Sequence, residues 1–193
     1  MSVVIGTAST TSSTSLTLDL NALTSRIAKL LRRNDLDTEI LQWINFAQRE
    51  LTDKVNFPEL RRGVYQTLST VQAEPFRYTL PDDFSRMDRV YWEDTTSTPS
   101  YGRTLTPLPR YLHESYLQHL LDIDNPISGD PLYYFIDNSS ILLYPSPSKA
   151  ARLELYYYRV VTDMTLGTNT PDINVQWRHY LIYLAYYLAF IRH

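Results

Sequence analysis

The chain has 193 residues, of which 44% are hydrophobic, and this is enough for one or two modest domains with a real core. Because it contains no cysteine, a disulfide-stapled fold, a thiolate nucleophile and a cysteine-based zinc site are excluded. A net charge of −3 at pH 7 disfavours a protein whose whole surface grips nucleic acid, since such proteins neutralise several phosphates and are usually basic.

Residues 1–18 are rich in Ser and Thr and are interpreted as a flexible arm. The segment has neither a basic start nor an apolar run long enough for a secretory signal. So few large apolar residues do not offset the entropy lost on ordering, which favours disorder in the isolated chain. Alternatively, the arm orders against a neighbouring subunit, where its β-branched residues would suit addition to the edge of a sheet.

Two helices are predicted next, joined by a short turn that favours an antiparallel hairpin. The first runs from Asp19, its N-cap, to Arg33, and the second begins after an N-cap at Asp37 or Thr38 and ends near Val55. The apolar face of the first helix is formed by Leu20, Leu23, Ile27, Leu30 and Leu31. The packing face of the second helix is formed by Ile40, Ile44, Ala47 and Leu51.

Residues 63–173 have the pattern of an inserted antiparallel β region, with short β-like runs separated by Pro, Asn, Asp and Ser. Residues 64–71 and 76–80 flank a turn and are expected to pair as a hairpin. A second turn is expected within residues 136–141. Helical spacing predicts a short helix near residues 109–121 inside this region, and alternation predicts a strand over residues 153–158.

The last segment, residues 174–193, predicts a helix that is apolar on nearly all sides. Its apolar and aromatic run covers residues 180–191, which is shorter than the roughly 20 residues of a membrane span, so membrane insertion is not expected. A helix of this kind must be covered by other protein, and a second subunit is the expected cover. The 16 tyrosines fit subunit interfaces, although many would also suit the core and the sheet surface.

These elements predict an α+β fold, in which a helical bundle of residues 19–62 and 174–193 carries the inserted β region of residues 63–173. No catalytic, metal-binding or cofactor-binding constellation emerges. No glycine precedes a lysine, as a P-loop requires, and the four histidines lack metal-ligand spacing. Residues 122–130 look superficially like a calcium loop but lack the glutamate at its twelfth position. Asp82 and Asp83 are adjacent and are expected to cap a turn rather than to flank a substrate.

Seven blocks carry a resemblance that covers nearly the whole chain. In order, they are LLRRND (30–35), WINFAQREL (43–51), FPELRR (57–62), PFRYTLPDDFSRMDRVYW (75–92), GDPLYYFIDNSSILLYPSPS (129–148), LELYYYRVV (153–161) and WRHYLIYLAYYLAF (177–190). This order of blocks resembles the head-to-tail adaptor proteins of tailed bacteriophages, also called connector or head-completion proteins.

The resemblance implies a structural, non-enzymatic virion protein without a cofactor, assembled in the host cytoplasm and placed at the head–tail junction. It implies a homo-oligomer, in a twelvefold ring, that binds beneath the portal protein and extends the DNA channel. Packaged double-stranded DNA would pass without sequence recognition and be retained, and tail or nozzle proteins would attach below. Similar adaptors often continue into a C-terminal tail that contacts the portal, whereas this chain stops at His193. The N-terminal arm or the first helix is therefore the expected substitute.

The expected subunit or portal interface combines basic pairs with large aromatic residues. It comprises Arg32, Arg33, Trp43, Arg61, Arg62, Trp177, Tyr180, Tyr183, Leu184 and Tyr187. The basic pairs would dock on an acidic portal surface or touch phosphates briefly, and the alternative is an ordinary surface with ion pairs. Two other functions stay open: an aromatic-rich module of the tail that binds glycans or a receptor, and a hydrolase of cell-wall glycan.

Overall fold

The computed structural model describes residues 18–70, 74–122, 127–165 and 167–192. The fold is mixed α+β, as predicted, and its described part contains four α-helices and sheets that are mainly antiparallel. The chain divides into two compact units, one formed by residues up to 51 and from 163 onward, and one formed by residues 52–162. The expected divisions were at 62 and 173. The predicted arm, residues 1–18, lies outside the described residues except for Leu18.

The first unit contains α1 (Leu20–Leu31), most of α2 (Asp37–Lys54), and α4 (Arg178–Arg192), which follows a 3₁₀ turn at Val175–Trp177. The predicted N-cap of α1 is confirmed, because Asp19 Oδ1 accepts a hydrogen bond from the Ala22 N–H at 2.9 Å. The helix ends two residues before the predicted Arg33. Arg32 adopts a left-handed φ of 55°, and the N–H groups of Arg32 and Arg33 close the last turn on preceding carbonyls.

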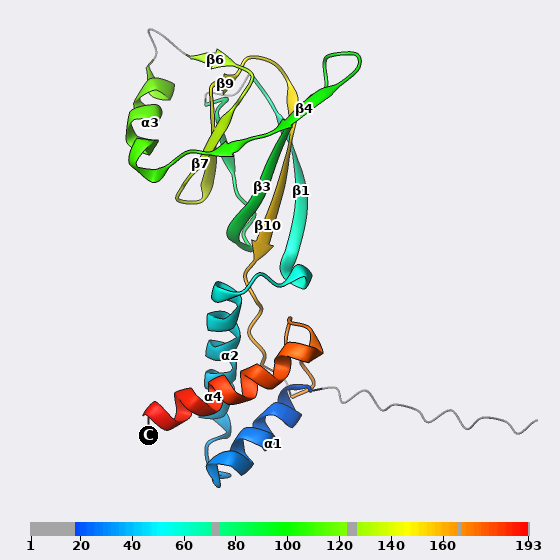
Figure 1. Cartoon of the computed structure of the whole chain (residues 1–193), viewed down its shortest axis with the longest axis vertical. Helices are drawn as coiled ribbons and strands as arrows, with labels where there is room; N and C mark the ends of the chain where they lie inside the picture. The colour runs from blue at the N-terminus through cyan, green and yellow to red at the C-terminus, as the bar shows by residue number, and fades with distance from the viewer. Residues whose placement is uncertain (1–17, 71–73, 123–126, 166, 193) are drawn as a thin grey trace, which may run out of the picture. The chain divides into compact units, whose positions relative to one another are not determined.

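Packing in this unit differs from the predicted hairpin of the first two helices. The most extensive contact of α1 is with α4, and the two helices lie side by side in Figure 1. Leu20, Leu23 and Ile27 are buried as predicted, but Leu30 is exposed and Ala28 takes its place in the core. The short connection limited the distance between α1 and α2, but it did not decide which helix would cover the apolar face of α1.

We call the first unit the helical unit and the second unit the β unit. Where the chain returns from the β unit to the helical unit, side-chain hydrogen bonds hold it to α2. Asn45 donates to the Met164 carbonyl at 3.0 Å and accepts from the Met164 N–H at 2.9 Å. The buried Gln48 accepts from the Asp172 N–H at 3.2 Å. Arg178, at the start of α4, donates to the carbonyls of three residues, Leu18, Pro171 and Ile173. Residues 163–173 therefore pack as part of the helical unit.

The second unit is built around a four-stranded antiparallel sheet with the strand order β1–β10–β3–β4. Its strands are β1 (Arg61–Leu68), β10 (Ala151–Arg159), β3 (Phe84–Asp94) and β4 (Tyr101–Thr104). A second sheet has the order β2–β8–β7–β5, and its last pair is parallel. Its strands are β2 (Arg77–Thr79), β8 (Ser140–Tyr144), β7 (Tyr133–Asp137) and β5 (Thr106–Pro107). A short parallel pair, β6 (Ser128–Gly129) and β9 (Ser146–Pro147), and α3 (His113–Leu121) complete the unit.

The local predictions in this unit had different outcomes. The turn within residues 136–141 is confirmed, since β7 and β8 form a hairpin around Asn138 and Ser139, and Asn138 adopts a left-handed φ of 52°. The short helix is also confirmed as α3, after a 3₁₀ turn at Arg110–Leu112. The hairpin of residues 64–71 and 76–80 is wrong, because β1 pairs with β10 and β2 pairs with β8. A turn signal showed where the chain breaks but not which strand each run joins.

The main core lies between the two sheets and is made by alternate residues of their strands. On β10, the buried residues alternate with residues that face the other way, which confirms the predicted strand. The core cluster comprises Leu68, Tyr78, Leu80, Val90, Trp92, Leu105, Tyr134, Ile141, Leu143, Ala151, Leu153 and Leu155. A smaller cluster beneath α3 comprises Phe76, Leu108, Leu120, Phe135 and Leu142. The opposite face of the β10 sheet is thus left for polar and aromatic side chains.

Candidate interaction surfaces

The helix α4 has two apolar faces with different surroundings. Its inner face is buried in the helical unit and comprises Leu181, Ile182, Ala185 and Ala189. Its outer face carries five large side chains that are 57–71% exposed: Tyr180, Tyr183, Tyr187, Phe190 and Ile191. We call these five residues the aromatic stripe. Their spacing of three and four residues, with Phe190 and Ile191 adjacent at the end, keeps them on one side of the helix. A contiguous exposed patch of this kind marks an interaction site.

The stripe extends to residues before α4. Trp177 is 39% exposed, and its ring centroid lies 5.4 Å from that of Tyr180. Leu184 is only partly buried and stands at the margin between the two faces of α4. The sequence pattern suggested a helix covered on nearly all sides by another subunit. In the single chain, one side is covered by the unit itself, and the stripe is the part still exposed.

Two hollows accompany the contact between α1 and α4. The first, about 320 Å³, is lined by Arg26, Lys29, Leu30, His179, Ile182 and Tyr183. The second, about 440 Å³, is lined by Leu31, Arg33, Leu36, Ala189 and Phe190. Both include a residue of the aromatic stripe together with basic side chains. An apolar surface bordered by positive charge fits a partner that presents apolar residues beside carboxylates.

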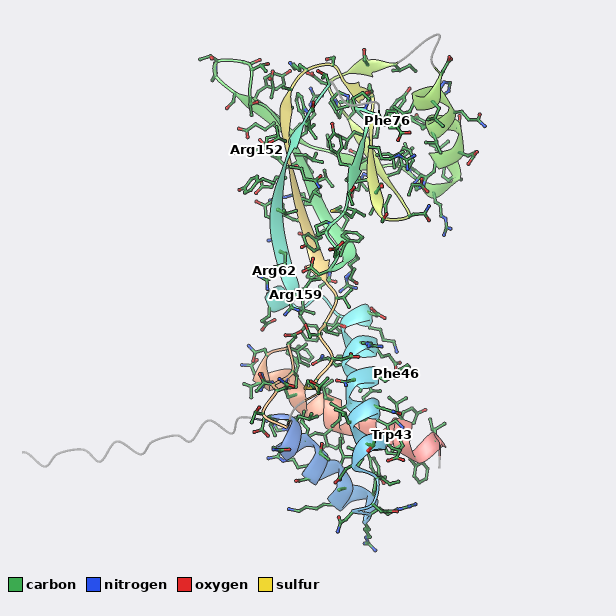
Figure 2. The ribbon with its side chains drawn as sticks, turned by 180° about the vertical axis from the view of Figure 1, so that it is seen from behind. Trp43, Phe46, Arg62, Phe76, Arg152 and Arg159 are labelled. Carbon is green, nitrogen blue, oxygen red and sulfur yellow. The ribbon has the colours of Figure 1, made fainter. Side chains whose placement is uncertain are left out.

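The helix α2 contributes a different aromatic residue from the one that the sequence suggested. Trp43 is only 6% exposed and belongs to the core of the helical unit. Phe46, one turn further along α2 in Figure 2, is 44% exposed. It lines a hollow of about 300 Å³ together with Gln42, Trp43, Asn45, Arg49 and Asp163. Trp43 and Phe46 are large apolar residues three positions apart on one helix, so the sequence offered no reason to treat them differently. Only the packing shows that Trp43 is buried and Phe46 is exposed.

The outward face of the β1–β10–β3 sheet is organised around Tyr156. Arg61 and Arg89, from the strands on either side of β10, lie 4.8 Å and 4.5 Å from the centroid of its ring. Gly63 lies beside this ring, and a Cβ there would be in ordinary van der Waals contact with it at 3.4 Å. The hydroxyl of Tyr156 donates to Glu154. This bond raises the pKa of Tyr156 and lowers the pKa of the Glu154 carboxyl.

Two arginines on this face, Arg61 and Arg152, are paired with carboxylates. Arg61 pairs with Asp88, with 2.8 Å between Nη2 and Oδ2. Arg152 pairs with Glu93 and lies 5.0 Å from the centroid of the Tyr65 ring. We call Arg61, Tyr65, Arg89, Arg152 and Tyr156 the arginine–tyrosine face. Its positive charges are largely compensated, so it is a poor surface for tight binding of a polyanion.

Residues 18–193 match the family described as SU10 adaptor protein. This chain belongs to that family. Because the match covers the helical unit and the β unit alike, the predicted resemblance to a phage head-to-tail adaptor is confirmed at the level of the family. The family description suggests a structural protein that interacts with a portal and with tail proteins. No curated protein matched the chain.

Within this SU10 adaptor family member, the ten residues suggested by the sequence fall into three places. Trp177, Tyr180, Tyr183 and Tyr187 lie together at or beside the aromatic stripe, with Leu184 at its margin. Arg32 and Arg33 are exposed at the end of α1, where Arg33 pairs with Asp35 at 2.6 Å, and Trp43 is buried on α2 in the same unit. Arg61 and Arg62 belong to the β unit, where Figure 2 shows Arg62 and Arg159 at the same end of the sheet.

Other residues of the candidate surfaces were missed by the sequence reasoning. Phe190 and Ile191 continue the aromatic stripe, and their spacing from Tyr187 was the available signal. Phe46, Tyr65 and Tyr156 needed the strand register or the helix packing to be recognised.

The described residues show few features of a catalytic or metal-binding site. Among them, no group of three His, Cys, Asp or Glu side chains is placed to hold a metal ion. The suspected calcium loop includes residues 123–126, which lie outside the described residues, and its Asp130 pairs with Arg103 and Lys149 at 3.4 Å. None of the helices in the described ranges is both long and apolar enough to cross a membrane.

An ion pair between the partly exposed Lys149 and the buried Asp94 holds the end of β3. The carboxylate of Asp94 is fully buried and accepts hydrogen bonds from Lys149 Nζ at 2.7 Å, from the Thr96 N–H at 2.8 Å and hydroxyl at 2.6 Å, and from the Ser97 hydroxyl. Lys149 also donates to the Tyr101 hydroxyl at 3.1 Å. These bonds, with that from Lys149 the strongest, hold the pKa of Asp94 well below its usual value and raise that of Lys149.

Asp94→Asn is expected to lower the midpoint of thermal unfolding by several degrees at pH 7, because Lys149 loses its buried counter-ion. Since the pKa of Asp94 is lower in the folded state, its contribution is full above the ordinary value of 3.8 and is lost as the pH falls below it. The difference between the variant and the wild type should therefore shrink below about pH 4. Calorimetry between pH 7 and pH 2 tests this, and a difference that does not depend on pH would contradict it.

Proposed function

We propose that this chain is a head-to-tail adaptor whose copies form a closed ring beneath the portal protein. The ring is twelvefold, lies at the head–tail junction of the virion and is assembled in the host cytoplasm. It extends the DNA channel, helps to retain the packaged double-stranded DNA and offers a platform to tail or nozzle proteins. Its action requires assembly alone, without catalysis and without a cofactor.

The observation that carries this proposal is the aromatic stripe of α4. Five large side chains that are more than half exposed are costly to leave in water, and covering them supplies a driving force for assembly. In a cyclic ring, each subunit places one patch against a different patch of its neighbour or of the portal. We propose that α1, α2 and α4 act as a helical bundle that presents these patches, with the stripe as the central contact.

Charge gives the proposed contacts their orientation. Arg32 and Arg33 at the end of α1, and Arg26 and Lys29 beside the first hollow, would face acidic side chains of the portal. The arginine–tyrosine face suits a different role. Because its arginines are already matched by Asp88, Glu93 and ring faces, DNA beside it would slide past without being held.

The test is the native mass of the purified chain, measured alone and after mixing with the portal ring encoded in the same genome. The expected result is a portal-bound complex with a fixed number of copies, twelve for a twelvefold ring. A mixture that shows free portal and free chain at every concentration tested would overturn the adaptor proposal. A bound ring with another number of copies would overturn the twelvefold symmetry while leaving the adaptor function intact.

A further inference from the structure

The strand β1 is an open edge of the main sheet. It pairs with β10 on one side, and in the described part of the chain no strand pairs with it on the other side. Figure 1 shows it as the outer strand beside β10. It has eight residues, whereas the other edge strands of the two larger sheets, β4, β2 and β5, have four, three and two. The outward N–H and C=O groups of β1 are therefore the longest row available to a further strand.

Beyond its first two residues, Arg61 and Arg62, this edge lacks the features that usually protect an edge strand from pairing. Residues 63–68 contain no charged side chain and no proline. The register of β1 with β10 is continuous, whereas that of β10 with β3 is shifted at two places. Charged residues, prolines and bulges are the common protections, and an edge that is regular and uncharged over six residues favours β-augmentation.

The chain itself contains a segment with the matching chemistry. Residues 1–17 precede the helical unit and contain no charged side chain and no proline, so every peptide N–H after the first residue can donate to a ladder. Eight of these residues are the β-branched types that favour strands: Val3, Val4, Ile5, Thr7, Thr10, Thr11, Thr14 and Thr17. With residues 3–8 in an added strand, residues 9–17 are left to connect it to the helical unit of its own copy, and nine extended residues reach about 30 Å.

We propose that the N-terminal segment of one copy adds as a strand to the outer edge of β1 in a neighbouring copy. The inference rests on the proposed ring, because it needs two copies to adjoin. Residues of one parity in the segment, such as Val3 and Ile5, would extend the apolar face beside the partly buried Val64. Residues of the other parity, such as Val4, would lie beside the exposed Tyr65. Each subunit would thereby be tied to the next by main-chain hydrogen bonds.

Disulfide trapping tests this directly, because the wild-type chain has no cysteine. One tagged copy carries Tyr65→Cys, and a second copy with a different tag carries a single cysteine at one of the positions from Val3 to Ala8. The two are assembled together on the portal and oxidised. The expected result is a strong covalent dimer with the one arm position that lies opposite Tyr65, at most a weak one with the positions two residues away, and none with the intervening positions, since alternate residues of a paired strand face opposite sides.

The matched control moves the partner cysteine one strand inward. Glu154 on β10 lies directly opposite Tyr65, so Glu154→Cys keeps the same face of the sheet. An added strand would then be about 10 Å from the cysteine, beyond the roughly 7 Å Cα separation that a disulfide allows. No covalent dimer is expected with this variant. Dimers with all six arm positions, with none, or equally with Glu154→Cys would overturn the inference.

Two further measurements separate this inference from the proposed function. The native mass of the same samples reports whether a portal-bound ring has formed. A ring that forms without the expected pattern of disulfide-linked dimers overturns the strand addition and leaves the adaptor function standing, whereas the absence of any ring overturns both.

In the assembled ring, deletion of residues 2–15 should speed hydrogen exchange of the β1 amides by about tenfold or more, since water replaces the added strand. Unchanged exchange in a ring of normal mass would overturn the inference.

Discussion

Tyr183→Asp is expected to prevent the chain from entering particles. Tyr183 is 69% exposed and occupies a central position in the aromatic stripe, so the substitution leaves the core of the helical unit intact. Assembly would instead bury a carboxylate in the apolar contact, which costs about 3–5 kcal/mol, and this lowers the affinity by a factor of roughly 150 to 5,000. The number of copies per purified particle, measured by quantitative mass spectrometry, should fall below detection.

Tyr111→Asp is the matched control for this prediction. Tyr111 is 82% exposed and belongs to the β unit rather than to the helical unit that carries the stripe, and the same change of side chain there should leave incorporation at the wild-type level. Tyr183→Phe should also be incorporated normally, because it keeps the ring. Leu184→Asp is expected to block incorporation too, but Leu184 is partly buried, so its folding must be checked by circular dichroism. If Tyr183→Asp enters particles as well as Tyr111→Asp does, the stripe is not an interface.

Features set by a few neighbouring residues were predictable from the sequence. Asp19 caps α1 because its carboxylate is three residues from the N–H that it accepts from, and this relation does not depend on the rest of the fold. Asn138 similarly favours the left-handed conformation that a two-residue hairpin needs. The order of elements and the α+β class followed from such local signals.

Strand partners and buried faces were harder to predict because they depend on the whole fold. β1 pairs with β10, which is about ninety residues later in the chain, and the gain from matching their apolar faces outweighs the local turn that suggested β2 as the partner. The arginine–tyrosine face could not be predicted for the same reason, since Arg61, Arg89 and Tyr156 meet only in the observed register.

The candidate interface was predictable only in part. The apolar and aromatic composition of α4 indicated that the helix needs cover, but both of its faces are apolar, so the sequence alone did not distinguish Leu181 from Tyr183. Trp43 illustrates the opposite error. A large aromatic residue on an amphipathic helix suits an interface and a core equally well. In this chain, Trp43 is buried in the core of the helical unit.

Leu155→Ala is expected to destabilise the β unit strongly. Leu155 is fully buried on the central strand β10, between Val64 and Val90 of the neighbouring strands. Truncation of a buried leucine costs about 2–5 kcal/mol, a large part of the 5–15 kcal/mol that stabilises a typical domain. The midpoint of thermal unfolding, followed by circular dichroism on the purified chain, should fall by about 10 °C or more.

The neighbouring residue provides the control, because Tyr156 lies on the opposite face of the same strand. Tyr156→Ala removes ring contacts with Arg61 and Arg89 but opens no cavity in the core, so a loss of about 1 kcal/mol is expected. Equal losses for the two variants would contradict the assignment of the core to the Leu155 side of the sheet. The pattern across variants also separates folding from assembly: Leu155→Ala should lower both the unfolding midpoint and incorporation, whereas Tyr183→Asp should lower incorporation alone.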